Sequence, residues 1–498
     1  MRRLSVVYLV VPGLVGGLVA VAASLVLRSV RGTAILGEIA ADATTFILGP
    51  EGFSYLLSKL GANGKPLLFL GVLLGQLAVY TLTSVVVAYA VWRRRGEDQR
   101  QSADLLRHVG PFGLQAVLTT GVFLLASLIL ISSTAAEMPS RTGWHEYALA
   151  TLGLAALYAA VAEALRTLLS QPRREERAAV GERALSRRRF LRLAGGYALG
   201  LAAAVFIGRQ VVERMGGGAQ RSYVGRPTPE TTANEDFYVV SKNFFDPKVD
   251  ADDWRLRVGG SAQRMLELTY DDIRHLPAQE EFVTLQCISN EVGGDLIGNA
   301  LWKGFPLRVL LEAVEPLPSA RFVFFRSYDD YSESLPLEFA TQDKVMLVYE
   351  MNGQPLPFKH GFPLRLLAPG KYGIKHPKWL TEIALVDEER FGYWQQRGWS
   401  QEARMHTSCR IDVPASLATI EEGPFRMQGL AFSGDRGISR VEVTTDGGQT
   451  WHDATLRPAL APFTWVLWHY DWNARAQEDF VKIMARATDD TGQVQTAR

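Results

Sequence analysis

The feature that most constrains this chain is a series of long apolar runs, free of charged residues, in its first two-fifths. These runs cover residues 4–27, 66–92, 109–136 and 147–162. A helix needs about 20 apolar residues to cross the hydrocarbon core of a bilayer, and the fourth run reaches that length with its flanks. Buried helices of a soluble core are the alternative, but they rarely lack charges so completely. We therefore predict an all-α membrane region over residues 1–170.

Basic residues beside these runs predict their orientation. Arg2 and Arg3 precede the first run, WRRRGEDQR follows the second, and RREERAAVGERALSRRR follows the fourth. Loops rich in Arg and Lys remain on the cytoplasmic side. The chain is thus predicted to be a multi-pass protein of the cytoplasmic membrane.

A fifth apolar segment, at residues 193–212, follows the sequence SRRRFLRL, which begins at Ser186. This sequence resembles a twin-arginine signal, which is read by a receptor and directs export of folded, often cofactor-loaded domains. An ordinary helix with basic flanks is the alternative. Both interpretations make residues 171–215 a basic loop plus a fifth span and put the rest of the chain on the extracytoplasmic side. No small-residue cleavage site is evident, so we expect the span to remain as an anchor.

The membrane half shows little sign of chemistry of its own. His108 and His145 lie at span edges on opposite sides of the bilayer, so they are not expected to share a haem. Glu163 is well inside a span, where Arg166 one turn later can pair with it. Since we see no interior polar cluster, we expect no proton relay, and a transporter is disfavoured.

The exported half is predicted to be a linker (216–236), an α+β domain (237–408) and a sandwich (409–498). The linker is rich in Gly, Pro and Thr. In the α+β domain, TYDDIRHL and LWKGFPLRVLLEAV suggest short helices, whereas DDWRLRVGG, FVTLQ and ARFVFFRSYDDYSESLPL suggest strands; KVMLVYEMNGQPLP suggests a strand with an Asn-Gly turn. The last part has short strands and no helix, which is typical of an immunoglobulin-like β-sandwich.

Composition narrows the chemistry. A net charge of +1 gives no reason to expect a nucleic-acid partner. Two cysteines exclude a disulfide framework or a four-cysteine iron–sulfur site within this chain. Cys287 ends the strand-like run FVTLQ and precedes a polar, glycine-rich loop, so its thiolate could be a soft metal ligand. An inert buried thiol is the alternative, and we assign that role to Cys409.

Four motifs around Cys287 carry a specific resemblance. LQCISN, IGNALWKGFPL, YEMNGQPLPFKHGFPLRLLAPGKYGIKHPKWL and YWQQRGW occur in this order. Together they resemble the sulfite oxidase family of molybdopterin enzymes, and the sandwich is similar to that family's dimerisation domain. The resemblance covers about residue 237 onward. It implies an α+β sulfite-oxidase-type domain, a molybdenum–molybdopterin cofactor and, through the sandwich, a homodimer.

The resemblance also implies roles for individual residues. Cys287 matches the cysteine ligand to molybdenum. Cations suit the phosphate of the pterin, because Arg offers a planar fork and Lys a point charge. Asp329 is matched to a pterin-binding acid, with Asp330 as the alternative. The residues that the resemblance assigns to cofactor binding are Asn243, Asp329, His360, Arg365 and Lys378.

Several of these residues have a purely structural interpretation. His360 beside Gly361 could be a turn residue, and Arg365 in an apolar strand could be half of a buried ion pair. Trp302 and Trp379 are expected in the core rather than stacked on a cofactor. The prediction therefore depends on the whole constellation.

The chain departs from the family pattern at the positions that hold substrate. Lys242 replaces the expected Arg, and Phe244 replaces the expected His of the Arg-Asn-His segment. Phe391 stands where the family has an active-site Tyr, and Tyr393 follows two residues later. Arg to Lys loses bidentate recognition, and Tyr to Phe loses a hydrogen-bond donor. Both changes weaken the expectation of sulfite as the substrate.

The sequence thus predicts a molybdenum-dependent oxidoreductase that performs two-electron oxygen-atom transfer outside the membrane. Cys287 would hold the metal, and Lys242 would attract a small anionic or oxide-type substrate. The direction stays open between oxidation of sulfite and reduction of a sulfoxide. A separate cytochrome or quinone-linked protein is expected to exchange electrons. The alternative is a catalytically inactive, membrane-anchored interaction or assembly protein, which the retained residues disfavour.

Overall fold

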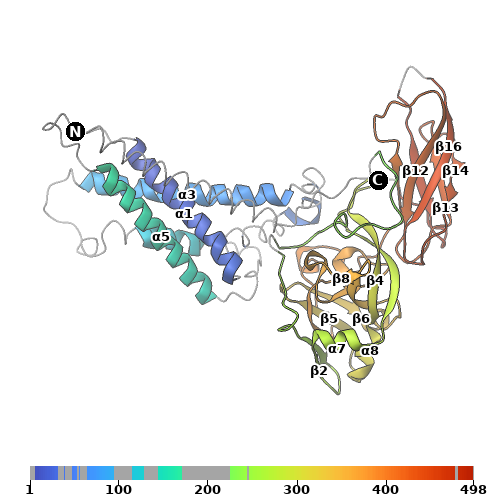
Figure 1. The fold of residues 1–498 in the computed structure, drawn as a ribbon, viewed down its shortest axis with the longest axis horizontal. Coiled ribbons are helices and arrows are strands. Elements are labelled where there is room, and N and C mark those ends of the chain that lie inside the picture. Colours follow the sequence, from blue (N-terminus) through green and yellow to red (C-terminus); the bar gives the residue numbers. More distant parts are fainter. Residues whose placement is uncertain are drawn as a thin grey trace. The chain divides into compact units, whose positions relative to one another are not determined.

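The computed structural model describes residues 6–31, 39, 48–52, 55, 64–94, 115–127, 144–170, 225–243, 246–476 and 480–496. They divide into two compact units. One holds the N-terminal helices together with Asn243. The other holds the remaining described residues from 225 onward and those between 49 and 55 (Figure 1).

Three helices of the first unit are long and apolar enough to cross a membrane. They are α1 (Val6–Arg31), α3 (Gly64–Arg94) and α5 (Trp144–Ser170). These confirm the first, second and fourth predicted spans as apolar helices of spanning length. In the region of the third predicted span, the structure describes only a shorter apolar helix, Gln115–Ser127. The fifth span and the twin-arginine-like sequence lie outside the described residues.

Glycines of α1 allow the three long helices to pack closely. A Cβ atom on Gly13 would lie 2.4 Å from the Cβ of Ser84 in α3, and one on Gly16 would lie 2.9 Å from the Tyr158 ring in α5. Small residues at such crossings let backbones approach, which stabilises helix pairs in a bilayer, where the hydrophobic effect between helices is weak. A larger side chain at Gly13 or Gly16 would require a neighbouring helix to move.

The expectation that the spans lack an interior polar cluster is wrong. The buried Arg166 donates to the Gln115 side-chain oxygen (2.7 Å), to Ser84 Oγ (2.6 Å) and to Glu163 (3.1 Å). The predicted pairing of Arg166 with Glu163 is confirmed. The partners are spread singly over three helices, so sequence inspection sees isolated polar residues, and only packing brings them together.

We expect Arg166→Leu to loosen the first unit. The change would leave the buried Gln115 and Ser84 side chains without their charged donor, and breaking a buried charged contact typically costs about 3–5 kcal/mol. Hydrogen–deuterium exchange of the full-length protein in detergent should then show at least tenfold faster exchange in α5. Glu163→Gln is the matched control with a smaller expected effect, because Glu163 is 36% exposed. Equal exchange in Arg166→Leu and the parent would contradict a stabilising role.

The α+β domain contains two five-stranded sheets. The first has the order β2-β1-β10-β5-β6, with β1 parallel to β10. The second has the order β3-β4-β7-β8, with β9 paired to β7. The strands of the first sheet are β1 (Leu256–Gly260), β2 (Leu266–Leu268), β5 (Phe322–Ser327), β6 (Ser332–Pro336) and β10 (Leu380–Val386). Those of the second are β3 (Gln279–Gln286), β4 (Ile297–Pro306), β7 (Met346–Met351), β8 (Gln354–Pro355) and β9 (Arg365–Leu367).

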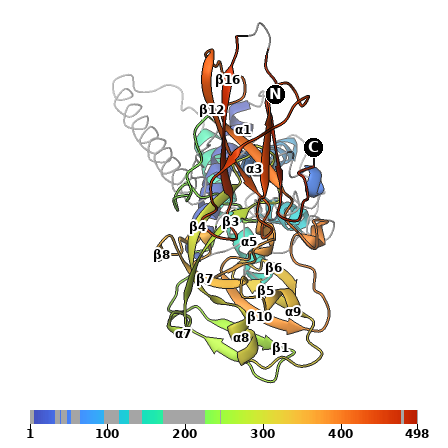
Figure 2. The same cartoon turned by 90° about the vertical axis from the view of Figure 1, so that its right-hand side faces the viewer.

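Short helices connect these strands, and Figure 2 shows α7, α8 and α9 beside the first sheet. Thr269 is the N-cap residue of α7 and forms a capping box, in which Thr269 and Asp272 satisfy each other's backbone N–H groups. The described helices of this domain are α7 (Tyr270–His275), α8 (Arg308–Ala313), α9 (Leu337–Ala340) and the 3-10 turns η2 (Phe358–His360), η3 (Gly373–Lys375) and η4 (Gln395–Arg397).

One predicted helix is half wrong. The prediction treats LWKGFPLRVLLEAV as one helix, but residues 301–306 complete β4 and only α8 is helical. Trp302 and Phe305 are fully buried there, and β4 is hydrogen-bonded to β3 on one side and β7 on the other. Because β4 is buried along most of its length, its apolar run can be mistaken for that of a buried helix.

The predicted C-terminal sandwich is present. Its sheets have the orders β11-β12-β16-β15 and β14-β13-β17. Met427, Val441, Val443 and Trp468 lie in the core cluster that both sheets contribute to. The strands are β11 (Ser408–Val413), β12 (Gly423–Phe432), β13 (Arg440–Thr444), β14 (His452–Asp453), β15 (Thr455–Leu456), β16 (Val466–Ala474) and β17 (Met484–Thr488).

Candidate functional site

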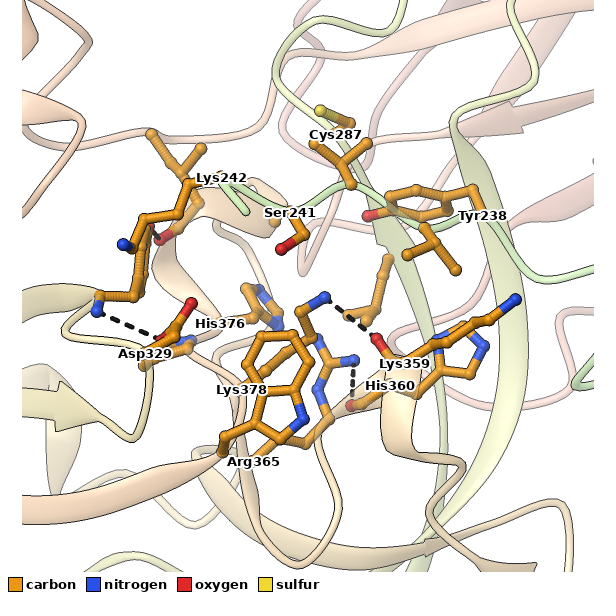
Figure 3. A pocket seen from close by; sticks show the side chains of 18 of the residues that line it. Tyr238, Ser241, Lys242, Cys287, Asp329, Lys359, His360, Arg365, His376 and Lys378 are labelled. Carbon is orange, nitrogen blue, oxygen red and sulfur yellow. Dashed lines mark hydrogen bonds between the residues drawn. The ribbon is translucent and has the colours of Figure 1, made fainter. Parts of the chain in front are cut away.

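One pocket of the α+β domain collects most of the residues singled out from the sequence. It encloses about 720 Å³, its open mouth included. Figure 3 shows its side chains, with Cys287 apart from a group formed by Arg365, His360 and Lys378. The singled-out residues that line it are Lys242, Cys287, Asp329, His360, Arg365 and Lys378.

Two neighbours of these residues do not line the pocket. Asp330 is outside it, so Asp329 is the acid of this pair that faces the cavity. Asn243 is not a lining residue either and belongs to the other compact unit. Its assignment to cofactor binding therefore stays a prediction.

Cys287 lies in the turn that follows β3. Its N–H donates to the Leu296 carbonyl (2.9 Å), and its own carbonyl accepts from Asn290 N–H (3.0 Å), which fixes the turn. The side chain is 5% exposed and unpaired with any other cysteine. Burial raises the pKa of its thiol, while Ser289 lowers it by donating hydrogen bonds to the sulfur. Such a thiol is a poor free nucleophile, but it suits a soft metal that would replace the proton.

Arg365 is a buried cation at the foot of the pocket. It begins β9, is 5% exposed, and donates through one terminal nitrogen to the His360 carbonyl (3.0 Å). Its Nε has no hydrogen-bond partner, and no carboxylate pairs with it among the described residues. Burial lowers its pKa to about 10, so it remains charged at neutral pH. The ion-pair interpretation of Arg365 thus has no partner in this part of the chain, and a bound anion would satisfy it.

A glycine turn brings the cations together. Gly361 has a φ of +113°, and a Cβ atom there would lie 3.0 Å from the Cβ of Lys378 and 3.1 Å from that of Arg365. Lys378 donates to the Lys359 carbonyl (3.0 Å) and lies 4.2 Å above the Trp379 ring. Trp379 is a core residue, as predicted, and also supports a cation.

Two imidazoles lie among these cations. The pKa values of His360 and His376 are both lowered to about 3, chiefly by burial and secondly by the positive charge of Arg365. Both imidazoles are therefore neutral at pH 7. His360 Nε2 is 3.1 Å from the Asn234 carbonyl, which fixes that nitrogen as the N–H. An anion near Arg365 would oppose the charge that depresses these pKa values. The arrangement therefore favours a phosphate-like group over a cation.

Sequence inspection missed several lining residues. His376 stands two positions before Lys378 in HPKW, and that proximity is a signal that could have revealed it. Tyr238 precedes Lys242 by four residues in FYVVSK, where no chemical signal marks it. The missed lining residues with polar side chains or aromatic rings are Phe237, Tyr238, Ser241, Tyr331, Lys359, His376 and Trp394.

The match of Phe391 to the family's active-site tyrosine stays a prediction, and the structure puts this residue away from the pocket. Phe391 is 55% exposed and does not line the pocket. Two phenols, Tyr238 and Tyr331, line it instead. Tyr393 is buried beside the pocket, and its ring carries the Lys242 ammonium at 5.0 Å. A motif compares positions along one stretch of the chain, whereas several separate elements line the pocket. The loss of one motif residue therefore does not show which hydrogen-bond donors the pocket contains.

Taken together, the pocket offers a soft sulfur ligand and a separate group of cations with neutral imidazoles. Among the described residues, Nε of the buried Arg365 has no hydrogen-bond partner. An anionic group bound at this end of the pocket could accept a hydrogen bond from it. A ligand that carries a soft metal at one end and an anion at the other fits this donor set.

Two domain families match this chain. The first, described as "Oxidoreductase molybdopterin binding domain", matches residues 244–394. The second, described as "Mo-co oxidoreductase dimerisation domain", matches residues 402–498.

Whole proteins match over the same half. Mitochondrial sulfite oxidase of Rattus norvegicus is 33% identical over 331 residues, which cover 56% of this chain and 60% of that protein. Sulfite oxidase of Gallus gallus is 31% identical over 335 residues, covering 56% of this chain and 72% of that protein. The chain thus matches 60% of the length of its mitochondrial relative. The crystal structure of the sulfane dehydrogenase SoxCD from Paracoccus pantotrophus aligns with a TM-score of 0.49 and 25% identity, over 54% of this chain and 75% of that one.

Proposed function

Because this chain belongs to the sulfite oxidase family of molybdopterin oxidoreductases, we propose that it transfers an oxygen atom to or from a small substrate. The observation that carries the proposal is the shared pocket of Cys287 and the buried cations around Arg365. The same observation speaks against a catalytically inactive assembly protein, which has no need of a soft ligand together with phosphate-binding cations.

Different pocket residues would bind different parts of the cofactor. Cys287 would hold molybdenum, and Arg365, Lys378 and His360 would bind the phosphate of the pterin. When bound, molybdenum–molybdopterin supplies two-electron oxygen-atom transfer. Asp329 accepts a hydrogen bond from Tyr331 N–H (3.2 Å), so its carboxylate is held in place for a donor of the pterin.

The chain's own groups would bind substrate and exclude water. Lys242 lies at the pocket over the Tyr393 ring, where its charge would attract an anion. Trp394, 6% exposed, and the buried aromatic residues around it would keep water from the reacting oxygen. An anion such as sulfite is favoured by the lysines, while a sulfoxide remains the other candidate substrate.

A membrane preparation of the full-length protein from a molybdopterin-competent host would test the proposal. Sulfite with an artificial electron acceptor tests oxidation, and dimethyl sulfoxide with an artificial donor tests reduction. Near-stoichiometric molybdenum and turnover in one direction, well above a Cys287→Ser control, would support it. Empty protein, or loaded protein that is no faster than the control in both assays, would reject it.

The surroundings of the reaction belong to the same proposal. We place residues 216–498 outside the cytoplasmic membrane, after export through the twin-arginine-like sequence and anchoring by the N-terminal spans. Electrons would pass to or from a separate cytochrome or quinone-linked protein. The sandwich would form a homodimer, in keeping with the family match of residues 402–498.

We expect Lys242→Met to raise KM for an anionic substrate about tenfold and to change kcat less, because a lost charge contact of about 1.4 kcal/mol changes binding tenfold. Lys242→Arg keeps the charge and should stay within about threefold of the parent. A neutral sulfoxide serves as the control substrate, since its KM should hardly respond. Equal KM changes for both substrates would point to general damage of the pocket rather than loss of anion binding.

A further inference from the structure

Tyr238 presents a phenol hydroxyl, a hydrogen-bond donor, to the pocket. Tyr238 is 8% exposed and belongs to the same apolar cluster as Cys287. Both residues line the cavity. The hydroxyl opens onto the cavity, and none of the hydrogen bonds found among the described residues involves it. A phenol in a largely buried pocket usually forms a hydrogen bond, so a ligand that fills the cavity is expected to accept one from Tyr238.

The backbone at Gly373 places the hydroxyl beside Cys287. A Cβ atom on Gly373 would lie 3.0 Å from the Tyr238 hydroxyl oxygen and 3.8 Å from the Cα of Cys287. The absence of a side chain at Gly373 therefore leaves room for the phenol at the cysteine end of the cavity, and Figure 3 shows Tyr238 near Cys287.

The ring of Tyr238 is held in place by its neighbours. The Tyr238 ring stacks on Phe237, with centroids 5.4 Å apart and planes 18° from parallel. A hydroxyl on a fixed ring is a pre-organised hydrogen-bond donor.

The other tyrosine of the pocket is already engaged. The Tyr331 hydroxyl donates to the Ile374 carbonyl (2.5 Å), which ties it to η3. Phe391, where the family has a tyrosine, carries no hydroxyl and is 55% exposed. Of the two tyrosines that line the pocket, Tyr238 is thus the one whose hydroxyl can donate a hydrogen bond to a ligand.

We propose that Tyr238 is a catalytic residue that donates a hydrogen bond to the oxygen of the substrate held beside Cys287. This inference rests on the proposed function and adds a residue to it. The phenol keeps its proton throughout, so its role is electrostatic: it stabilises negative charge on the substrate oxygen. Removal of one such donor typically lowers the rate about a hundredfold or more.

The test compares Tyr238→Phe with the parent as full-length, cofactor-loaded protein. We expect unchanged molybdenum content, a kcat for sulfite or dimethyl sulfoxide about a hundredfold lower, and a smaller change in KM. Tyr349→Phe is the matched control, because Tyr349 is a core tyrosine, 3% exposed, that does not line the pocket. Gly373→Ala is a second variant, since its methyl group would crowd the Tyr238 hydroxyl and should lower kcat in the same direction.

A binding measurement separates this inference from the proposed function. Sulfate is titrated into each loaded protein and followed by tryptophan fluorescence, because Trp379 and Trp394 line the pocket. We expect Tyr238→Phe to bind sulfate about tenfold more weakly than the parent and the Tyr349→Phe control. Equal sulfate affinity, or a parent that binds no sulfate, would overturn the role of Tyr238 whatever the turnover. Sulfate binding that depends on Tyr238 in a loaded protein without turnover would reject the proposed reaction and leave the donor role standing.

Discussion

Replacement of Cys287 by serine is expected to lower turnover at least a thousandfold while the fold is kept. Serine is nearly isosteric, and the turn around Cys287 is held by backbone hydrogen bonds to Leu296 and Asn290 that the change does not touch. The serine hydroxyl, however, is a hard oxygen ligand with a far higher pKa, so it is a poor replacement for a thiolate on a soft metal. The measurements are kcat, molybdenum and pterin content, and the electronic spectrum of the loaded protein.

Cys409→Ser is the matched control for this change. Cys409 is also buried, at 3% exposure, but it lies in the core of the sandwich. There the more polar serine hydroxyl should lower the free energy of unfolding by about 1–3 kcal/mol without altering kcat of the folded protein. Two outcomes would contradict the assignment of Cys287 as metal ligand: retention of more than a tenth of the parent turnover in Cys287→Ser, or the same loss in both variants.

Arg365→Met is expected to have two effects of opposite sign. Cofactor content should fall by at least tenfold, because charge-assisted hydrogen bonds to a phosphate contribute about 1.5–3 kcal/mol each. The cofactor-free protein should be as stable as the parent or more so, since a buried guanidinium without a carboxylate partner costs free energy that methionine does not. Cofactor content is measured on the purified full-length protein, and unfolding is followed by tryptophan fluorescence.

The lysine variant provides the control for this prediction. Arg365→Lys keeps the charge but loses the planar fork, so it should retain an intermediate amount of cofactor. A purely structural role for Arg365 predicts the reverse pattern, in which Arg365→Met destabilises the cofactor-free protein and loses cofactor only through unfolding. Full cofactor content in a stable Arg365→Met protein would remove Arg365 from the binding site.

Much of the architecture is readable from local pattern. The long uncharged runs predict α1, α3 and α5, because each hydrophobic span is a property of consecutive residues. Alternating and turn residues likewise predict β7 with its Asn-Gly turn, where Asn352 and Gly353 both have positive φ. The motifs around Cys287 indicate the family, since they combine unusual residue types in a fixed order.

Local pattern fails where a residue's environment comes from distant parts of the chain. Residues 301–306 look helical beside the truly helical α8, yet pairing with β3 and β7 makes them a strand. Arg166 looks like a residue at a span edge, yet packing joins it to side chains from two other helices.

Residue types and their order along the chain are enough to predict the apolar helices, the sandwich, the family and the chemical types of the candidate ligands. Which of these residues share a cavity depends on how the chain folds: Asp329 lines the pocket and Asp330 does not, and Tyr238 lines it whereas Phe391 does not. The physical reason is that residue type and order are local properties, whereas burial and hydrogen bonding are set by long-range packing. Tyr238, Cys287 and Arg365 line one cavity only once β3, β9 and η3 meet.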